Sequence, residues 1–340
     1  MSNSAQPETA NQFYINAKHE RRMGTYNPDD ERYHPEYKER NPSFELNETQ
    51  FFGFSVPEER IHALTYNWAH PNLDLVSAGV FVAQGMKPFA PAFEICDYRA
   101  YLPISGLPKG LLSYETIGGY SVEVIDPGKL FRTTYLDQER NNSFDVYHHA
   151  IYEPCVWSNE THLEQVMRTE GEVVLRGKRY DVNGTHIRDR SWGEIRSEMP
   201  RNVPPITWMS GVFEDGAAFH VTATDDPRRK PVWVDHFQLT EEETLKFGWI
   251  IIDNVTTPIV KCSKITRYDA NFFPSHIEME LTDQLGRQFH ITGEMVAGFP
   301  FNAWHNCRWP ICMTRWTCGD RSGWGEAQDG QWTDFLLKVM

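Results

Sequence analysis

Residues 184–196 hold the densest group of side chains able to do chemistry in this chain. Three arginines, two carboxylates, a histidine and a tryptophan fall within that short segment. Burying such groups costs on the order of several kcal/mol unless each one is paired. A fold gains nothing from this density, whereas a binding or catalytic site uses it. The segment is therefore the first candidate for a functional site.

Asp189 is the first candidate for the acid or base of that site. Alternation along a strand would point Arg188, Arg190 and Trp192 to one side and leave Asp189 on the other. An apolar pocket lined by an indole raises the pKa of a carboxyl group, which suits a proton donor or acceptor. Arg188 and Arg196 would orient this carboxylate or hold an anionic oxygen. The alternative, equally open, is that Asp189 pairs with Arg188 or Arg196 and only ties two domains together.

His220 is the second candidate, with Trp208 upstream and a turn at 215–216 between them. The even separation of Trp208 and His220 keeps both on one face of a hairpin if the turn preserves the register. Trp192 and Trp208 would form an apolar wall, where a cation-like intermediate gains roughly 0.5–2 kcal/mol from an indole face. The alternative for His220 is an ordinary, partly exposed strand histidine.

Glu326 is the third candidate and closes a C-terminal run, 315–326, that turns at 319–320. Gly323 and Gly325 predict close backbone approach within a closing strand. Glu326 is either a buried catalytic carboxylate or the partner of an arginine in a barrel seam. The predicted catalytic set is Asp189, His220 and Glu326. The predicted substrate-binding set is Arg188, Trp192, Arg196 and Trp208.

Cofactor-binding motifs are missing from the sequence. It contains no Gly-rich phosphate loop, dinucleotide fingerprint, G-x-S-x-G elbow or H-E-x-x-H helix. Cys307, Cys312 and Cys318 lack the C-x2-C spacing of a structural zinc site, which favours ordinary core thiols. We therefore expect no cofactor and no metal, so that side chains would act by acid–base and electrostatic means.

The elements that position these residues are predicted to be strands. Short runs rich in aromatic and β-branched residues, separated by Gly, Pro, Asn and Asp, extend from 50 to 182 and again from 207 to 328. Such spacing is typical of antiparallel sandwiches or barrels. Hairpin turns are predicted at 126–128 and 183–184. A chain of 340 residues suits two such domains in tandem, and the strand pattern breaks at 199–205.

The predicted organisation is an N-terminal arm over 1–43, a first β-domain over 44–197 and a second over 198–340. The arm is polar, has few branched aliphatics and is expected to carry a short helix around 12–23. It would wrap its own domain or a partner, and a homodimer is one possibility.

The net charge of −14 disfavours nucleic acid and anionic membrane surfaces as partners. No window approaches the roughly 18 apolar residues of a membrane span, and no apolar signal-peptide core is present. A cytoplasmic protein is therefore expected. With 11 tryptophans and 20 phenylalanines, a β-barrel has material for an aromatic-walled cavity, suited to a hydrophobic small molecule.

Several motifs resemble one known family. Residues 188–193 read R-D-R-S-W-G, residues 162–165 read H-L-E-Q, and residues 47–52 read N-E-T-Q-F-F. They resemble the R-D-H-S-W-G-x-R signature, its upstream H-x-E-Q strand and the opening N-E-S-x-Y-F strand of the hydroxyneurosporene synthase (carotenoid hydratase)-like superfamily. In the second half the matching positions are Trp208, Asp215, Gly216, His220, Arg321, Gly323, Gly325 and Glu326.

The resemblance implies an all-β fold of two tandem antiparallel lipocalin-like (calycin) barrels, no organic cofactor, and a hydrophobic substrate near the inter-domain face. The family includes hydratases that add water to an isolated double bond and is similar to fungal Diels–Alderases that cyclise polyenes. Two positions depart from the signature. Arg190 stands where the family has histidine, and Ile195 holds the place of the closing arginine, which follows as Arg196.

These observations lead to one hypothesis and two alternatives. The hypothesis is a cofactor-independent lyase or isomerase that hydrates, dehydrates or cyclises a hydrophobic isoprenoid, steroid or aromatic molecule. The alternative from another class is a non-catalytic protein that binds a hydrophobic ligand. A hydrolase is the third reading, disfavoured because no nucleophile motif is present.

Overall fold

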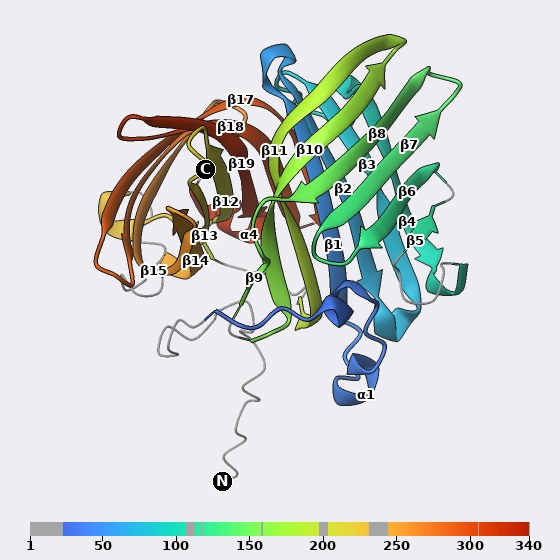
Figure 1. Ribbon diagram of the computed structural model, residues 1–340, viewed down its shortest axis with the longest axis horizontal. Coiled ribbons are helices and arrows are strands. Elements are labelled where there is room, and N and C mark those ends of the chain that lie inside the picture. Colours follow the sequence, from blue (N-terminus) through green and yellow to red (C-terminus); the bar gives the residue numbers. More distant parts are fainter. Residues whose placement is uncertain are drawn as a thin grey trace.

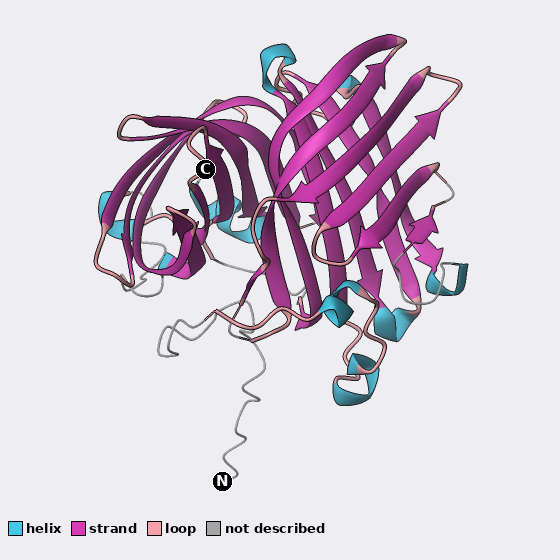
Figure 2. Ribbon diagram, in the orientation of Figure 1, coloured by secondary structure: helices cyan, strands magenta, loops and turns pink. Residues whose placement is uncertain are grey.

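The computed structural model describes residues 23–106, 113–116, 118–157, 159–196, 203–230, 244–304 and 306–339. It consists of two β-domains that lie side by side, with a short N-terminal arm beneath the first (Figure 1, Figure 2). Helices are short within the described ranges, and none is long and apolar enough to cross a membrane.

The first domain is one curled antiparallel sheet with the strand order β4-β3-β2-β1-β11-β10-β8-β7-β6-β5, and β9 pairs with β10. Its strands are β1 Leu46–Val56, β2 Ile61–His70, β3 Leu75–Gln84, β4 Ile95–Pro103, β5 Ser113–Glu115, β6 Tyr120–Asp126, β7 Leu130–Asp137, β8 Asn142–Ala150, β9 Cys155–Val156, β10 His162–Leu175 and β11 Lys178–Ile195. Short 3-10 helices join them: η2 Pro57–Glu59, η3 Pro71–Leu73, η4 Ala90–Ala92 and η5 Ile104–Gly106.

The curl of this sheet brings distant strands together over one core. Tyr135 on β7 donates a hydrogen bond to Asp97 on β4 at 3.1 Å, although six strands lie between β4 and β7 in the sheet order. Phe52 and Phe54 on β1 belong to the same buried cluster as Phe131 and other residues of β6–β8. This concave face is therefore filled by side chains, as in a half-closed barrel.

The second domain is a closed antiparallel barrel of eight strands. The strands are β12 Ile206–Phe213, β13 Ala218–Thr224, β14 Leu245–Ile252, β15 Val255–Tyr268, β16 Pro274–Asp283, β17 Gln288–Trp304, β18 Cys307–Cys318 and β19 Arg321–Trp332, with η6 Pro227–Arg229 after β13 and α4 Thr333–Val339 at the end. Its interior is packed with apolar side chains such as Phe219, Met279 and Trp316, so the barrel has its own core.

The predicted all-β tandem calycin-like fold is confirmed, and so is the turn at 126–128 between β6 and β7. The turn predicted at 183–184 is wrong. Asn183 and Gly184 lie inside β11, opposite Glu170 and Thr169 of β10. The chain reverses instead at Arg176 and Gly177, which have φ of 53° and 82°. Two consecutive positive φ values are what a tight hairpin turn needs, and Gly177 adopts one without strain.

The described part of the arm, residues 23–43, wraps its own first domain. It contains η1 Pro28–Glu31 and α1 Tyr37–Arg40. Glu31 pairs with Arg188 of β11, and the ring of His34 stacks on Trp192 at 4.9 Å. The helix predicted around 12–23 falls almost entirely outside the described residues.

The two domains meet through an aromatic interface. The face of the first sheet opposite its core packs against the outside of the barrel, and one buried cluster includes Phe51, Trp208, Trp249 and Phe299. Backbone bonds add to it: the peptide nitrogen of Gly298 on β17 donates to the carbonyl oxygen of Gly85 at 3.1 Å. Buried aromatic area of this kind holds the domains in a fixed relation.

Candidate functional site

The charged residues of the inter-domain face are positioned by the hairpin of β10 and β11. Its register places Glu164 opposite Asp189 and His162 opposite Ser191. Because directly opposite side chains of an antiparallel pair point to the same face, the carboxylates of Glu164 and Asp189 share a site. That face is the one turned toward the barrel.

His162 lies between three carboxylates. Its Nε2 is 3.0 Å from Asp189 Oδ2 and 3.4 Å from Glu164 Oε1, while its Nδ1 is 3.0 Å from Glu194 Oε1. Burial alone would lower the pKa of His162, but the charges of Glu194 and Asp189 outweigh it and raise the pKa to about 10. The imidazole is therefore a cation at neutral pH.

Glu164 is the buried centre of the network. Both of its carboxyl oxygens are 2.8 Å from the indole nitrogen of Trp157, and Oε2 is 3.3 Å from that of Trp249. Its Oε1 is 3.2 Å from His220 Nε2. Burial raises the pKa of Glu164 to about 8, against the opposing effect of His162. Glu164 is thus largely a neutral carboxylic acid at pH 7.

His220 extends the network into an aromatic environment. The centroid of its ring lies 4.7 Å from that of the Trp208 ring and 6.0 Å from that of the Trp249 ring. Burial lowers its pKa well below the ordinary value, so the ring is neutral. Within the described residues, His220 Nδ1 and the indole nitrogen of Trp208 have no hydrogen-bond partner. Buried polar atoms of this kind are rare and call for an explanation, such as a bound polar group.

The other end of the network reaches the protein surface. The side chains of Asp189 and Glu194 are 13% and 19% exposed, whereas that of Glu164 is fully buried. Arg196 donates to Ser191 Oγ at 2.9 Å, to Tyr66 at 3.1 Å and to Glu194 at 3.2 Å. A continuous set of titratable groups therefore leads from solvent to the ring of His220.

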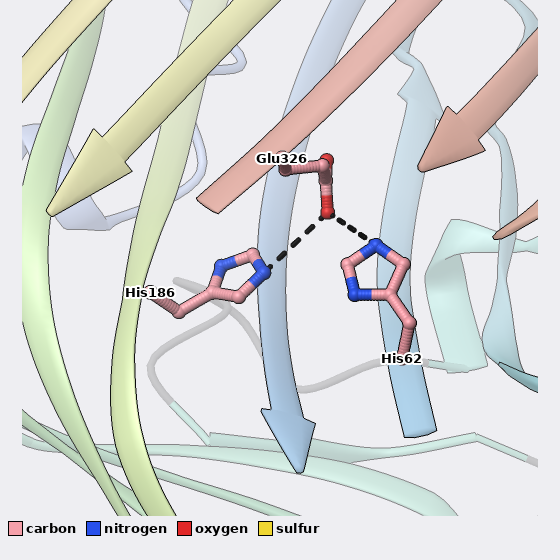
Figure 3. Close-up of side chains that lie close together, drawn as sticks. All are labelled: His62, His186 and Glu326. Atoms are coloured by element: carbon pink, nitrogen blue, oxygen red, sulfur yellow. Dashed lines mark ion pairs between the residues drawn. The ribbon is translucent and has the colours of Figure 1, made fainter. Parts of the chain in front are cut away.

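Glu326 belongs to a neighbouring cluster that also joins the domains. Its Oε2 is 2.9 Å from His62 Nε2 on β2 and 3.4 Å from His186 Nε2 on β11 (Figure 3). Burial alone would raise the pKa of Glu326, but the two histidines more than offset this and lower it to about 2. Burial lowers the pKa of His62. The cluster thus combines an ionised carboxylate with a neutral imidazole.

His186 reaches this cluster because residue 53 is a glycine. Pairing of β1 with β11 is recorded up to Phe51 and Asp189, after which the strands part. A Cβ atom on Gly53 would lie 2.5 Å from Cε1 of the His186 ring, closer than real side-chain contacts allow. Glycine therefore leaves the space through which this imidazole passes toward the barrel.

The two clusters are neighbours on the barrel wall. On β12, Ser210 has His220 of β13 on one side and Glu326 of β19 on the other. Phe51 of the first domain lies between the clusters and contacts the rings of both Trp208, at 6.0 Å, and His186, at 5.7 Å. The structure thus brings the three predicted catalytic residues to one inter-domain face, in two adjoining groups.

Residues 27–334 match the model of a family described as a domain of unknown function, DUF7064. The chain belongs to this DUF7064 family. No curated protein sequence matches it. Among solved structures, kievitone hydratase from Nectria haematococca is similar, with a TM-score of 0.51, 12% identity and coverage of 85% of this chain and 89% of that one. A candidate AttH protein from Nitrosomonas europaea is also similar, with a TM-score of 0.57, 13% identity and coverage of 86% and 94%.

At these identities the similarity establishes a shared fold. The DUF7064 chain has the two-domain architecture of these proteins, and one of them is a hydratase. What this chain itself does is argued from its own residues.

Arg188 and Trp192 lie on the other side of β11, away from the network. Arg188 donates to both oxygens of Glu31 in the arm, at 2.6 and 3.0 Å, and Trp192 stacks on His34. Strand alternation explains this, since Arg188, Arg190 and Trp192 face the arm and Asp189, between them, faces the barrel. Arg188 therefore does not orient Asp189, and Trp192 does not share a wall with Trp208. Arg196 is close to the network: it donates to Glu194, and its charge also interacts with that of Asp189.

The structure shows what Arg190 does at the position where the family signature has histidine. Arg190, which stands in its place, donates to the carbonyl oxygens of Thr49 and Arg32 at 2.8 and 2.6 Å and pairs with Glu48. It thus serves the arm side of β11.

Sequence reasoning missed Glu164, His162 and Trp157. The first two lie in the H-L-E-Q strand that carries the family resemblance, so a signal was present. Placing the hairpin turn at 176–177 instead of 183–184 would have set Glu164 opposite Asp189. His62 and Trp249 gave no comparable signal, because their partners lie in the other domain and nothing local marks them.

Proposed function

We propose that this chain is a hydratase-type lyase that adds water to, or removes it from, a hydrophobic small molecule. The observation that carries the proposal is Glu164, a buried carboxylic acid held between His162 and His220 and hydrogen-bonded by Trp157. A carboxyl group whose pKa lies close to the working pH is a suitable general acid and, once deprotonated, a suitable base.

In this proposal the proton passes from Glu164 through His220. Nε2 of His220 lies 3.2 Å from Glu164 Oε1 and 3.1 Å from the hydroxyl of Thr222, and Nδ1 is the atom of this ring with no hydrogen-bond partner in the described structure. The distance to Glu164 is within reach of proton transfer. His220 Nδ1 delivers a proton to one alkene carbon while its Nε2 takes one from Glu164. Water then adds to the other carbon and gives its second proton to His220 Nδ1, and His220 returns the proton on Nε2 to Glu164, so that both groups regain their starting forms. The hydrogen and hydroxyl together make up one water molecule.

The surroundings of His220 favour a hydrophobic substrate that develops positive charge. The rings of Trp208, Trp249 and Phe247 lie within 4.7 to 6.1 Å of the imidazole. An indole face stabilises a cation-like carbon by roughly 0.5–2 kcal/mol in a dry site. Asp189 is proposed as the acid–base group at the rim, where it links His162 to solvent. An isoprenoid, steroid or aromatic substrate, action without a cofactor and a cytoplasmic location remain part of the proposal.

The test is turnover in oxygen-18-labelled water. The purified chain is incubated with kievitone, with acyclic isoprenoids and with unsaturated steroids, and the products are analysed by mass spectrometry. A hydratase yields a product that has gained one labelled water. Glu164→Gln and Asp189→Asn should lower the rate, the former by about 10²–10⁴-fold. Glu278→Gln, which alters a carboxylate on the outer surface of β16, is the matched control.

Three results would overturn the proposal. A folded Glu164→Gln variant with unchanged turnover removes the proposed acid. A hydrophobic molecule that co-purifies unchanged in mass, and is retained equally by Asp189→Asn, indicates a binding protein instead. Label recovered in a carboxylic acid released from an ester indicates a hydrolase.

A further inference from the structure

The cluster of His62, His186 and Glu326 has three buried atoms that converge without hydrogen bonds. His62 Nε2, His186 Nε2 and Glu326 Oε2 lie within 4.8 Å of one another. Two of the contacts, 2.9 and 3.4 Å, are short enough for ion pairs, yet in the described structure none of the three atoms has a partner in hydrogen-bond geometry. Unpaired buried polar atoms are costly, so three at one point require a common explanation.

The outer atoms of the same side chains are all engaged. His186 Nδ1 is 3.0 Å from the carbonyl oxygen of Ile187, and His62 Nδ1 is 3.0 Å from the hydroxyl of Ser55. Gln328 donates to the other oxygen of Glu326. A carbonyl oxygen only accepts, so Nδ1 of His186 carries a hydrogen, and Nε2 is the ring atom that can offer a lone pair toward the carboxylate. A lone pair on Nε2 and a lone pair on the carboxylate repel each other unless a proton or a metal ion lies between them.

We propose that His62, His186 and Glu326 bind one divalent transition-metal ion, with Zn²⁺ as the fitting occupant, and that this ion joins the two domains. Two histidines and one carboxylate are the ligand set of catalytic zinc sites that keep a fourth position open. Tetrahedral ligands about 2.0–2.2 Å from zinc lie roughly 3.3–3.6 Å apart. The 3.4 Å between Glu326 and His186 matches this range, and the 2.9 Å between Glu326 and His62 would lengthen when the ion binds. The hydrogen bonds on both Nδ1 atoms are the outer contacts that hold metal-binding histidines in place.

The position of the cluster explains why the ion would join the domains. His62 and His186 come from β2 and β11 of the first sheet, and Glu326 comes from β19 of the barrel (Figure 3). All three lie on strands and are almost completely buried, so the ligands are held rigidly. The proposal is independent of the proposed hydratase, because none of these ligands belongs to the Glu164 network.

A second group, His162, Glu164 and Asp189, also has ligand-type atoms close together. It differs at the histidine. Both ring nitrogens of His162 lie 3.0 Å from carboxylate oxygens in hydrogen-bond geometry, so each carries a hydrogen and neither offers a lone pair. The metal is therefore assigned to His62, His186 and Glu326.

The test uses the full chain after dialysis against a chelator. Zn²⁺ is titrated by calorimetry, and Co²⁺ is followed by its visible absorption. We expect one ion per chain and the Co²⁺ spectrum of a tetrahedral site. Glu326→Gln should weaken Zn²⁺ binding by more than about 100-fold, and Ser55→Ala, which removes only an outer contact, by roughly 10–100-fold. His290→Gln, in an exposed cluster with Glu278 and Glu280, should leave this binding unchanged.

Circular dichroism establishes that each variant is folded. If Glu326→Gln does not fold, Ser55→Ala carries the test, since it keeps all three ligands. The proposal is overturned if no stoichiometric Zn²⁺ binding is found. It is overturned equally if Glu164→Gln abolishes the binding while Glu326→Gln or Ser55→Ala leaves it intact.

Discussion

The hairpin of β10 and β11 carries buried charged groups on both of its sides, and the two sides use them in different ways. On the side that faces the arm, Arg188 forms a bidentate salt bridge with Glu31 and also donates a hydrogen bond to Gln165 at 2.8 Å. On the side that faces the barrel, one imidazole serves three carboxylates, and the deepest of them, Glu164, is kept protonated.

The comparison distinguishes charged groups that stabilise the fold from charged groups whose pKa values are set for proton transfer. A buried charge with its own fitted partner has no reason to change its protonation state, so it anchors the chain. Carboxylates crowded around one cation in a dry site have their pKa values pushed apart, which prepares proton transfer. Burial alone would not have distinguished the two sides, since Arg188 and Glu164 are both almost completely inaccessible.

The largest loss in free energy of unfolding is expected from Arg188→Met on the arm side. The substitution leaves Glu31 buried without its partner, and removal of one member of a buried pair costs about 3–5 kcal/mol. Urea denaturation followed by tryptophan fluorescence measures the loss. Limited proteolysis should also cut within residues 23–43 of the variant before it cuts the sheets.

The matched control is the double variant Glu31→Gln with Arg188→Met. Removing both charges avoids the unpaired carboxylate, so most of the lost stability should return. A single variant that loses less than about 1 kcal/mol would mean that Arg188 is not an anchor, and the contrast between the two sides of β11 would fail.

Sequence patterns predicted the fold well and the site in part. Strand runs, turn residues and alternation depend on neighbours in the chain, and they yielded the tandem β-domains and the opposite facing of Arg188 and Asp189. The partners of Asp189 depend on the register of β10 with β11, which a misplaced turn concealed. The histidines around Glu326 depend on how two domains pack, and no local pattern encodes that.

A smaller effect, dependent on pH, is expected from Glu164→Gln on the barrel side. The pKa of Glu164 is raised from its ordinary value of 4.5 to about 8 in the folded chain. Between these values the unfolded chain has lost this proton and the folded chain has kept it. The contribution of Glu164 to stability is therefore complete below pH 4.5 and is lost as pH rises through 8, by at most about 1.4 kcal/mol for each pH unit.

Glutamine has no proton to lose, so the variant does not share the parent's loss of stability with rising pH. The free energy of unfolding of the variant relative to that of the parent should therefore rise between pH 5 and 6.5. That range lies within the interval from 4.5 to 8 and stops at the ordinary pKa of His162, whose own shift acts from 6.5 to about 10. Urea midpoints at several pH values measure the difference. Parallel curves for parent and variant over this range would show that Glu164 is ionised in the folded protein, and the proposed acid would be lost.

The smallest effect is expected from Asp145→Asn, which tests whether burial decides the strength of an ion pair in this fold. Asp145 and Arg132 form a bidentate salt bridge at 2.8 and 2.6 Å, similar in geometry to that of Arg188 with Glu31. Their side chains are 41% and 35% exposed. Water solvates both charges when the pair is broken, so the expected cost is about 0–1 kcal/mol and should shrink further in 1 M salt. Urea denaturation at low and high salt measures it, and a cost equal to that of Arg188→Met would mean that geometry rather than burial makes the arm-side pairs into anchors.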